Sequence, residues 1–305
     1  MQTRDWLFLS ILACLWGFSF LFVELGLQMF TPQALVTLRV GIGALFLWLV
    51  LAPGENPFPH SWSLWGWFLL VGLINNAIPF NLISLAQEEI SSGMASILNA
   101  TTPFWALLIA RIVHRDEPVT FNRLAGLMTG IAGVAVLVAP DDTAVSLPLG
   151  ATLMMFGATL SYAIAGQFGR KLLSVTPLQA ACGSLTGATL FSIPATLYSG
   201  FYVPEVLPGE GNVWLMTIAV LGIAIPCTAL AYPLYFIILK SSGATNLLLV
   251  TLLVPVVAVL VGVVLLNETI TSQALAGMGI ILFGLVVLDG RIIRKARNLF
   301  SAHPS

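Results

Sequence analysis

Residues 117–137, EPVTFNRLAGLMTGIAGVAVL, recur at residues 268–288 as ETITSQALAGMGIILFGLVVL. When each residue n is laid over residue n+151, the two segments share a glutamate, two glycines and several apolar residues at matching places. The glutamate and glycine matches are the stronger evidence for a duplication, because apolar sequences produce many leucine and valine coincidences by chance. The chain is therefore predicted to contain an internal duplication.

The duplication extends upstream with small changes of offset, as loop insertions would cause. At an offset of 150, the step Ser92-Gly93 matches Ser242-Gly243. We therefore predict one five-helix repeat over residues 1–140, a second over residues 147–290, and a basic cytoplasmic tail over residues 291–305.

The composition places this chain in a membrane. Hydrophobic residues make up 58% of it and charged residues 8%, whereas soluble domains carry about 25% charged residues. Ten apolar stretches have roughly the ~20 residues needed to cross the hydrocarbon core. Because a repeat with an odd number of spans must reverse its orientation, the sequence predicts an all-α polytopic membrane protein with ten transmembrane helices in two inverted five-helix repeats. The predicted spans are residues 5–29, 32–52, 64–86, 91–113, 119–139, 147–169, 177–199, 213–239, 242–266 and 272–290.

The basic residues indicate the orientation. If the N-terminus is cytoplasmic, eleven of the twelve lysines and arginines fall at cytoplasmic ends or loops, and only Arg39 lies inside a span. This distribution follows the positive-inside rule. We therefore expect a multi-pass protein of the cell inner membrane with both termini cytoplasmic. The basic tail is expected to contact anionic membrane lipids and not nucleic acid.

Glu24 and Arg39 are the formal charges well inside the predicted spans, where a lone charge is costly. At a rise of 1.5 Å per residue, both lie roughly 9–12 Å below the turn between the first two helices. Equal depth in a tight hairpin predicts an ion pair that fixes helix packing or forms an outer gate. The alternatives are proton coupling through Glu24 and capture of a substrate carboxylate by Arg39.

Asparagines and prolines gather in the middle of matching spans. Asn75 and Asn81 lie on either side of Pro79 in the third span, and Asn99 precedes Pro103 in the fourth. Amides and proline-freed carbonyls need partners in hydrocarbon, so these spans are expected to line an interior cavity. Proline-interrupted segments at corresponding places in two repeats point to a midplane substrate site. The alternative is that the amides only bond across helices.

Large rings occupy corresponding mid-span places in the first and sixth helices, at Trp16 and Tyr162, and Gln167 projects toward the same region. The predicted substrate-binding residues are Trp16, Asn75, Asn81, Asn99, Trp105, Tyr162, Gln167, Tyr235 and Asn246. The predicted hinge or gating residues are Pro79, Pro103, Pro226, Pro255, Glu24 and Arg39.

Helices five and ten are rich in glycine and nearly free of polar groups. Small-residue faces suit close helix contact, either within the chain or between protomers. A homodimer through these two helices is the corresponding expectation. The glycines are Gly126, Gly130 and Gly133 in helix five, and Gly277, Gly279 and Gly284 in helix ten.

The residues argue against catalysis in the membrane. An intramembrane hydrolase needs a buried nucleophile and base, but His60, His114 and His303 fall in predicted loops or in the tail, and no His-Glu-x-x-His pattern exists. The three cysteines follow no metal-ligand spacing. We therefore expect neither enzyme activity nor a cofactor or metal.

The order and duplication of these motifs resemble the EamA-type members of the drug/metabolite transporter superfamily over nearly the whole chain. Two departures are Tyr162-Ala163 in place of a second Trp-Gly, and Ser184 where Arg39 has its counterpart. The matching residues include Trp16-Gly17-Phe18-Ser19, Pro32, Arg39, Ser92-Gly93, Pro103 and Glu117, with Ser242-Gly243, Pro255 and Glu268 in the second repeat.

The resemblance implies a secondary transporter that exports small metabolites. Amino acids are favoured, and aromatic ones first, because the chain resembles a bacterial aromatic amino acid exporter of that superfamily. Alternating access would come from rocking of one repeat against the other. A lining of rings and amides suits a neutral or zwitterionic, partly apolar solute. Export of another metabolite or drug-like solute, and a non-transporting sensor or scaffold, are the alternatives.

Overall fold

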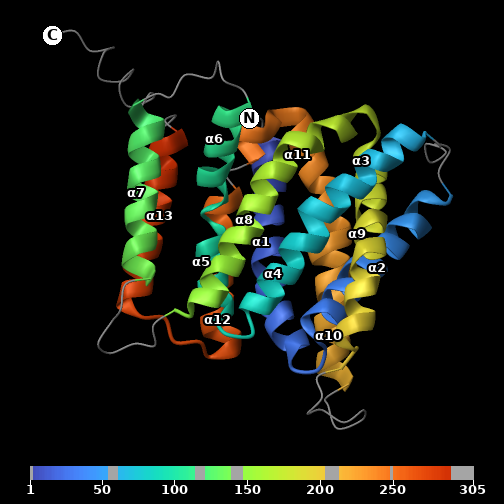
Figure 1. Ribbon diagram of the computed structural model, residues 1–305, viewed down its shortest axis with the longest axis horizontal. Coiled ribbons are helices and arrows are strands. Elements are labelled where there is room, and N and C mark those ends of the chain that lie inside the picture. The colour runs from blue at the N-terminus through green and yellow to red at the C-terminus, as the bar shows by residue number, and fades with distance from the viewer. Residues whose placement is uncertain are drawn as a thin grey trace.

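The computed structural model describes residues 3–53, 61–113, 121–138, 147–202, 213–247 and 250–289. Regular structure in these ranges is helical, and the one β-type pairing found there is an isolated bridge between Phe30 and Tyr202. The elements are α1 (Thr3–Leu27), α2 (Pro32–Leu51), α3 (Trp62–Gly72), η1 (Leu73–Ala77), α4 (Ile78–Ala86), α5 (Ser92–Asn99), α6 (Thr102–Val113), α7 (Phe121–Val138), α8 (Leu149–Gly169), η2 (Arg170–Ser174), α9 (Pro177–Ser199), α10 (Val213–Ala224), η3 (Ile225–Leu230), α11 (Ala231–Leu247), α12 (Val250–Leu266) and α13 (Ser272–Asp289) (Figure 1).

Six helical stretches are long and apolar enough to cross a membrane, judged by length and composition. Their outer surfaces are apolar, as contact with lipid requires: Leu197 is 80% exposed and Tyr198 is 97% exposed. These findings confirm an all-helical polytopic membrane protein. The six stretches are Thr3–Leu27, Pro32–Leu51, Trp62–Ala86, Leu149–Ser174, Pro177–Ser199 and Val213–Gly243, and shorter apolar helices cover Leu124–Leu137, Leu253–Leu266 and Ser272–Val287.

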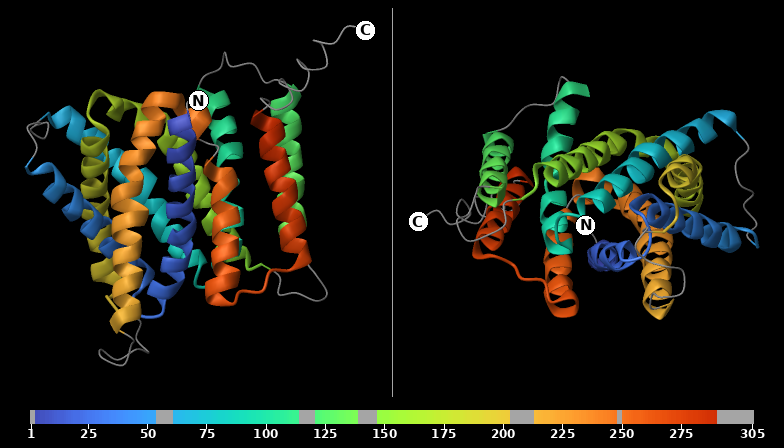
Figure 2. Two further views of the ribbon diagram at one scale, coloured as in Figure 1. Left: turned by 180° about the vertical axis from the view of Figure 1, so that it is seen from behind. Right: turned by 60° about the horizontal axis from the view of Figure 1, so that its bottom comes forward.

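Helices from the two halves of the chain interleave. α1 packs mainly against α12 and α10, whereas α2 packs mainly against α9. Figure 2 shows α1 lying between α10 and α12. The largest buried cluster accordingly joins Leu12 and Phe80 of the first half to Tyr232 of the second. Close van der Waals packing of these side chains therefore holds the two halves together.

Two spans each contain one wide helical turn. The π-helix η1 joins α3 to α4, and the π-helix η3 joins α10 to α11. In the first of them, the Ile78 N–H donates to the carbonyl of Leu73, five residues back. Pro79 is the second residue after η1, and Pro226 lies within η3. Proline lacks an N–H and crowds the preceding turn, so a wider turn accommodates it within a continuous span.

The fourth predicted span is interrupted beside Pro103. α5 ends at Asn99 and α6 begins at Thr102. The Thr101 hydroxyl donates to the carbonyl of Leu98 at 2.7 Å, and the Thr102 hydroxyl donates to that of Asn99 at 2.8 Å. The carbonyls left over at this break are thus satisfied by local side chains.

α11 bends at Gly243, where φ is +79°. Glycine adopts this left-handed backbone conformation without the steric cost that a side chain brings. The predicted hinge residue Pro255 lies instead inside α12, whose helix continues on both sides of it. The local break in this part of the chain is therefore at the Ser242-Gly243 step.

α7 and α13 form a tightly packed pair at one edge of the molecule (Figures 1 and 2). A Cβ atom on Gly133 would lie 2.8 Å from the Ile281 nitrogen, and one on Gly284 would lie 2.8 Å from the Gly130 nitrogen. The glycine faces of predicted helices five and ten therefore meet each other within the chain. A homodimer through these helices would have to use their other faces.

Replacing Gly284 with alanine is expected to force these two helices apart, because overpacking a close contact costs about 1–3 kcal/mol. Thermal unfolding of the purified protein in detergent should show a melting temperature lower by several degrees. Gly279→Ala on the same helix is the matched control, since nothing lies within 4 Å of a Cβ atom there. Equal melting temperatures for the two variants would contradict the packing argument.

Candidate substrate-binding site

Arg39 lies in α2 and is only 5% exposed. Its Nε donates to the Thr228 hydroxyl at 2.9 Å, and its guanidinium carbon lies 3.5 Å from the centre of the Phe80 ring. The Thr228 hydroxyl in turn donates to the Ile223 carbonyl at 2.8 Å. The wide turn of η3 thus orients the threonine oxygen toward Arg39. One guanidinium is held between elements of both halves of the chain.

The predicted ion pair between Arg39 and Glu24 is wrong. The titratable groups close enough to interact electrostatically with Arg39 are Tyr162, Tyr232 and Cys227, and none of these is a carboxylate. Glu24 instead accepts a hydrogen bond from Gln87 Nε2 at 3.4 Å. The prediction assumed a tight hairpin, but α1 and α2 pack against different partners and scarcely against each other. Equal depth therefore did not bring the two charges together.

The contacts of Arg39 barely offset the cost of burying its charge. A desolvated cation–π contact contributes about 2 kcal/mol, and a hydrogen bond to a charged group contributes about 1.5–3 kcal/mol. Removing an ion from water costs several kcal/mol even after relaxation. An apolar residue would pack here at least as well. A buried charge of this kind within a membrane span marks a functional site.

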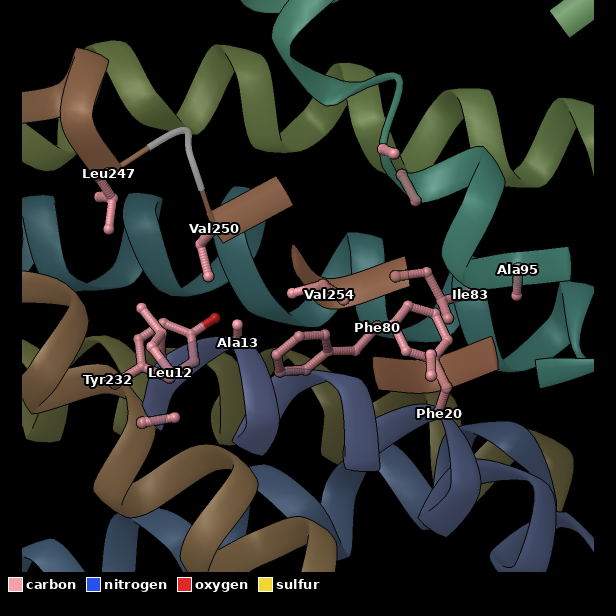
Figure 3. Packing of buried hydrophobic residues seen from close by; sticks show 14 of the residues in the cluster. Leu12, Ala13, Phe20, Phe80, Ile83, Ala95, Tyr232, Leu247, Val250 and Val254 are labelled. Atoms are coloured by element: carbon pink, nitrogen blue, oxygen red, sulfur yellow. The ribbon is translucent and has the colours of Figure 1, made fainter. Parts of the chain in front are cut away.

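Three aromatic rings form a cluster beside the arginine. Trp16 lies 6.3 Å from Tyr232 and 6.0 Å from Tyr235 between ring centres, and the two tyrosine rings are 6.1 Å apart. The Tyr232 hydroxyl donates to the Asn75 carbonyl at 3.3 Å. Figure 3 shows the buried cluster that contains both Tyr232 and Phe80, the ring under Arg39. Tyr232 contacts the other two rings and is close enough to Arg39 to interact with it electrostatically.

Several buried amides in the third and fourth predicted spans lack complete hydrogen bonding. The Oδ1 atoms of Asn81 and Asn99 are buried and have no hydrogen-bond partner among the described residues, and neither amide atom of Asn76 has one. The nitrogen of Asn81 donates to the Ala77 carbonyl at 2.7 Å. Because an unsatisfied buried polar group costs about 1–3 kcal/mol, these acceptors are suited to a ligand that supplies donors.

Three other predicted site residues have no contact with this cluster among those that the structure describes. Trp105 packs on Phe156, with ring centres 6.2 Å apart, and not on Trp16. Gln167 is half-buried and makes no hydrogen bond to another described residue. The side chain of Asn246 lies outside the described residues.

Sequence reasoning did not select three residues of the site. Tyr232 and Thr228 lie in the same polar and proline-containing segment as Tyr235. The composition of that segment could have indicated both residues. Phe80 gave no signal, because a phenylalanine in an apolar span looks like any other packing residue. Its role depends on which helix faces Arg39.

A carboxylate closes one end of the bundle. Glu268 accepts hydrogen bonds from the Ser92 N–H at 2.9 Å, the Ser92 hydroxyl at 2.6 Å and the Gly93 N–H at 3.0 Å. The unpaired N–H groups at the first turn of α5 carry the positive end of the helix dipole, which favours a carboxylate. A Cβ atom on Gly262 would lie 2.5 Å from the carboxylate, so glycine makes room for it. We call this contact the Glu268 latch.

Asp5 makes a corresponding contact with the Ser241-Ser242 step. It accepts hydrogen bonds from the hydroxyls of Ser241 at 3.1 Å and Ser242 at 2.8 Å, beside the bend at Gly243. We call this contact the Asp5 latch. The Ser-Gly step of each half is thus held by a carboxylate of the other half. Glu117, the counterpart of Glu268 in sequence, lies outside the described residues.

The two latches lie at opposite ends of the bundle. Asp5 and Glu24 are about 28 Å apart along α1 at 1.5 Å per residue, and Glu24 is close enough to Glu268 to interact with it electrostatically. Figure 1 shows the start of α1 near the top, and the end of α12 near the bottom. The cluster around Arg39 and Tyr232 draws on spans that run between these ends.

Comparison with known proteins agrees with this architecture. The sequence matches the EamA-like transporter family twice, over residues 4–139 and 149–288. A solved crystal structure of a protein with 20% identity covers 98% of this chain and 99% of its own, with a TM-score of 0.67. That likeness shows the fold.

Three relatives align over almost their full lengths. "Uncharacterized transporter" of Archaeoglobus fulgidus is 25% identical, over 96% of this chain and 99% of its own. "Probable amino-acid metabolite efflux pump" of Salmonella typhimurium is 26% identical, over 97% and 99%. "Uncharacterized inner membrane transporter YedA" of Escherichia coli K12 is 24% identical, over 97% and 92%. The family and these relatives are transporters and not enzymes. Because the two family matches together cover most of its length, the chain belongs to the EamA-like transporter family and is a multi-pass membrane transporter.

Proposed function

We propose that this protein exports small metabolites across the inner membrane by alternating access, with amino acids, and aromatic amino acids first, as its substrates. The observation that carries the proposal is the group formed by buried Arg39 and Tyr232 with half-buried Trp16 and Tyr235, where both halves of the chain meet. A cation beside large rings suits a solute with both a carboxylate and an aromatic part. A relative of similar length is named as an amino-acid metabolite efflux pump.

The transport cycle that we propose uses ten transmembrane helices in two inverted five-helix repeats, residues 1–140 and 147–290, with both termini cytoplasmic. The two family matches and the π-helices at corresponding places, η1 and η3, support this arrangement. Inverted repeats allow one half to rock against the other around a central site. The positions of the basic residues in the sequence support the cytoplasmic termini.

The latches are the proposed gates of this cycle. Each latch joins the two halves at one end only, so rocking that opens an end must break its latch. The Glu268 latch would close the outer end, and the Asp5 latch would close the inner end. Breaking one while the other holds exposes the central residues to one side at a time.

Counterflow of labelled tryptophan in proteoliposomes tests the function directly. We expect saturable uptake against an internal pool of tryptophan, with strong inhibition by phenylalanine and weak inhibition by threonine, a nucleoside or a cationic dye. Inhibition chiefly by the dye would favour a drug-like substrate. Absent counterflow with verified, folded protein would reject aromatic amino acids as substrates.

Replacing Trp16 with leucine is expected to lower tryptophan counterflow about tenfold, since an aromatic contact and its buried area together contribute about 1.4 kcal/mol or more. Trp105→Leu is the matched control, because the structure packs Trp105 on Phe156 and away from the cluster. Initial rates at equal amounts of inserted protein give the comparison. Similar losses in both variants would argue against a binding site at Trp16.

Replacing Glu268 with glutamine removes the charge of the Glu268 latch while keeping its size. Charge-assisted hydrogen bonds are roughly twice as strong as neutral ones, so the proposed outer gate should open more often and the exchange rate should change several-fold. Glu89→Gln is the control, because that carboxylate is exposed near the same end. If Glu268→Gln transports as Glu89→Gln does, the latch is not a gate.

A further inference from the structure

Arg39 has two outer nitrogens that the protein leaves available. Its Nε donates a hydrogen bond to Thr228, and its planar face packs on the Phe80 ring. Neither Nη atom makes a hydrogen bond to a described residue. The residue is only 5% exposed, and no carboxylate in the described part of the chain lies near enough to interact with it. A guanidinium held at one edge and one face presents its remaining donors in a fixed direction. This arrangement matches the fork that binds both oxygens of a carboxylate.

We propose that Arg39 binds the carboxylate of the transported solute and selects for it. The inference rests on the proposed function and deepens it, because it names the carboxylate as the group of the solute that the protein recognises. The substrate class is a monocarboxylate that also carries an aromatic or other large apolar part. Arg39 is then a specificity-determining residue of this site.

The aromatic cluster sets where the rest of the solute lies. Tyr232 interacts with Arg39 and also contacts the rings of Trp16 and Tyr235. A carboxylate on Arg39 therefore leaves the apolar part of the solute within reach of these rings. Planar rings prefer to stack or to meet edge to face at such distances.

The same geometry assigns unequal roles to the two charges of an amino acid. Glu24 lies near Gln87 and Glu268, not near Arg39. An ammonium group on the solute would meet hydroxyls, rings or amide oxygens around the site and no acid among the described residues. Removing the carboxylate should therefore weaken binding far more than removing the ammonium group.

Competition in tryptophan counterflow tests this directly in the wild-type protein. Tryptophanamide lacks the carboxylate, and indole-3-propionate lacks the ammonium group. We expect indole-3-propionate to inhibit within a few-fold of tryptophan, and tryptophanamide to need at least about tenfold higher concentration, because a site built to bind a polar group rejects the analogue without it. Equal inhibition by the amide and the acid would overturn the inference.

Variants of Arg39 test whether this residue determines the selectivity for a carboxylate. Arg39→Gln should reduce the preference for tryptophan over tryptophanamide to near unity, and Arg39→Lys should retain part of it, because lysine keeps the charge but loses the two-point geometry. Arg170→Gln, which changes an exposed arginine on η2, is the control and should keep the full preference. An undiminished preference in folded Arg39→Gln would overturn the assignment.

A melting experiment separates failure of this inference from failure of the proposed function. Purified wild-type protein is unfolded with tryptophan, indole-3-propionate or tryptophanamide present, and ligand binding raises the melting temperature by mass action. Stabilisation by both carboxylates and not by the amide supports the inference, even if Arg39→Gln fails to fold or counterflow is absent. Stabilisation by the amide alone, or by none of the three, overturns it. Absent counterflow alone rejects the proposed transport of tryptophan.

Discussion

A bilayer offers no water to a polar group, so each one inside it must find a partner within the protein. Most of the polar geometry here follows from that constraint. The hydroxyls of Thr129 and Thr152 donate to carbonyls four residues back in their own helices. Gln87 donates to the Phe20 carbonyl and to Glu24, which ties the end of α4 to α1. Proline leaves the carbonyl four residues earlier without its usual donor. The Thr102 hydroxyl donates to the Asn99 carbonyl before Pro103, and the Tyr232 hydroxyl donates to the Asn75 carbonyl before Pro79.

The same constraint explains why the two halves of the chain are held at their ends by carboxylates. A helix that starts within the bundle leaves N–H groups unsatisfied, and Glu268 fulfils that need for α5 by reaching across from the other half. Such a contact is strong while closed and can be replaced by water when its end of the bundle opens. In the proposed cycle, the polar contacts at the two ends break and re-form, while apolar packing keeps the two halves together.

The sequence predicted the helical membrane fold because hydrophobic length and glycine spacing are properties of single segments. It also drew attention to Trp16, Tyr235 and Arg39, since rings and charges in mid-span are rare enough to notice. It could not place Arg39 against Phe80, because that contact depends on the rotation of α2 and α4. The expected pair of Arg39 with Glu24 failed for the same reason: depth along a helix is readable from sequence, but the facing side is set by tertiary packing. The Asp5 latch was missed because a charge near a helix end normally faces water.

Duplication of the scaffold has not produced a symmetric centre. Ser184 stands where the second half would carry the counterpart of Arg39, and its hydroxyl donates to the Ala180 carbonyl in its own helix. A second arginine would add another desolvated cation close to the first, at a cost that neither Thr228 nor Phe80 could offset. A single cation fits a solute with a single carboxylate, and it gives that solute one orientation in the site. In the proposed cycle, the repeat allows the rocking motion, and the one unmatched charge fixes the orientation of the bound solute.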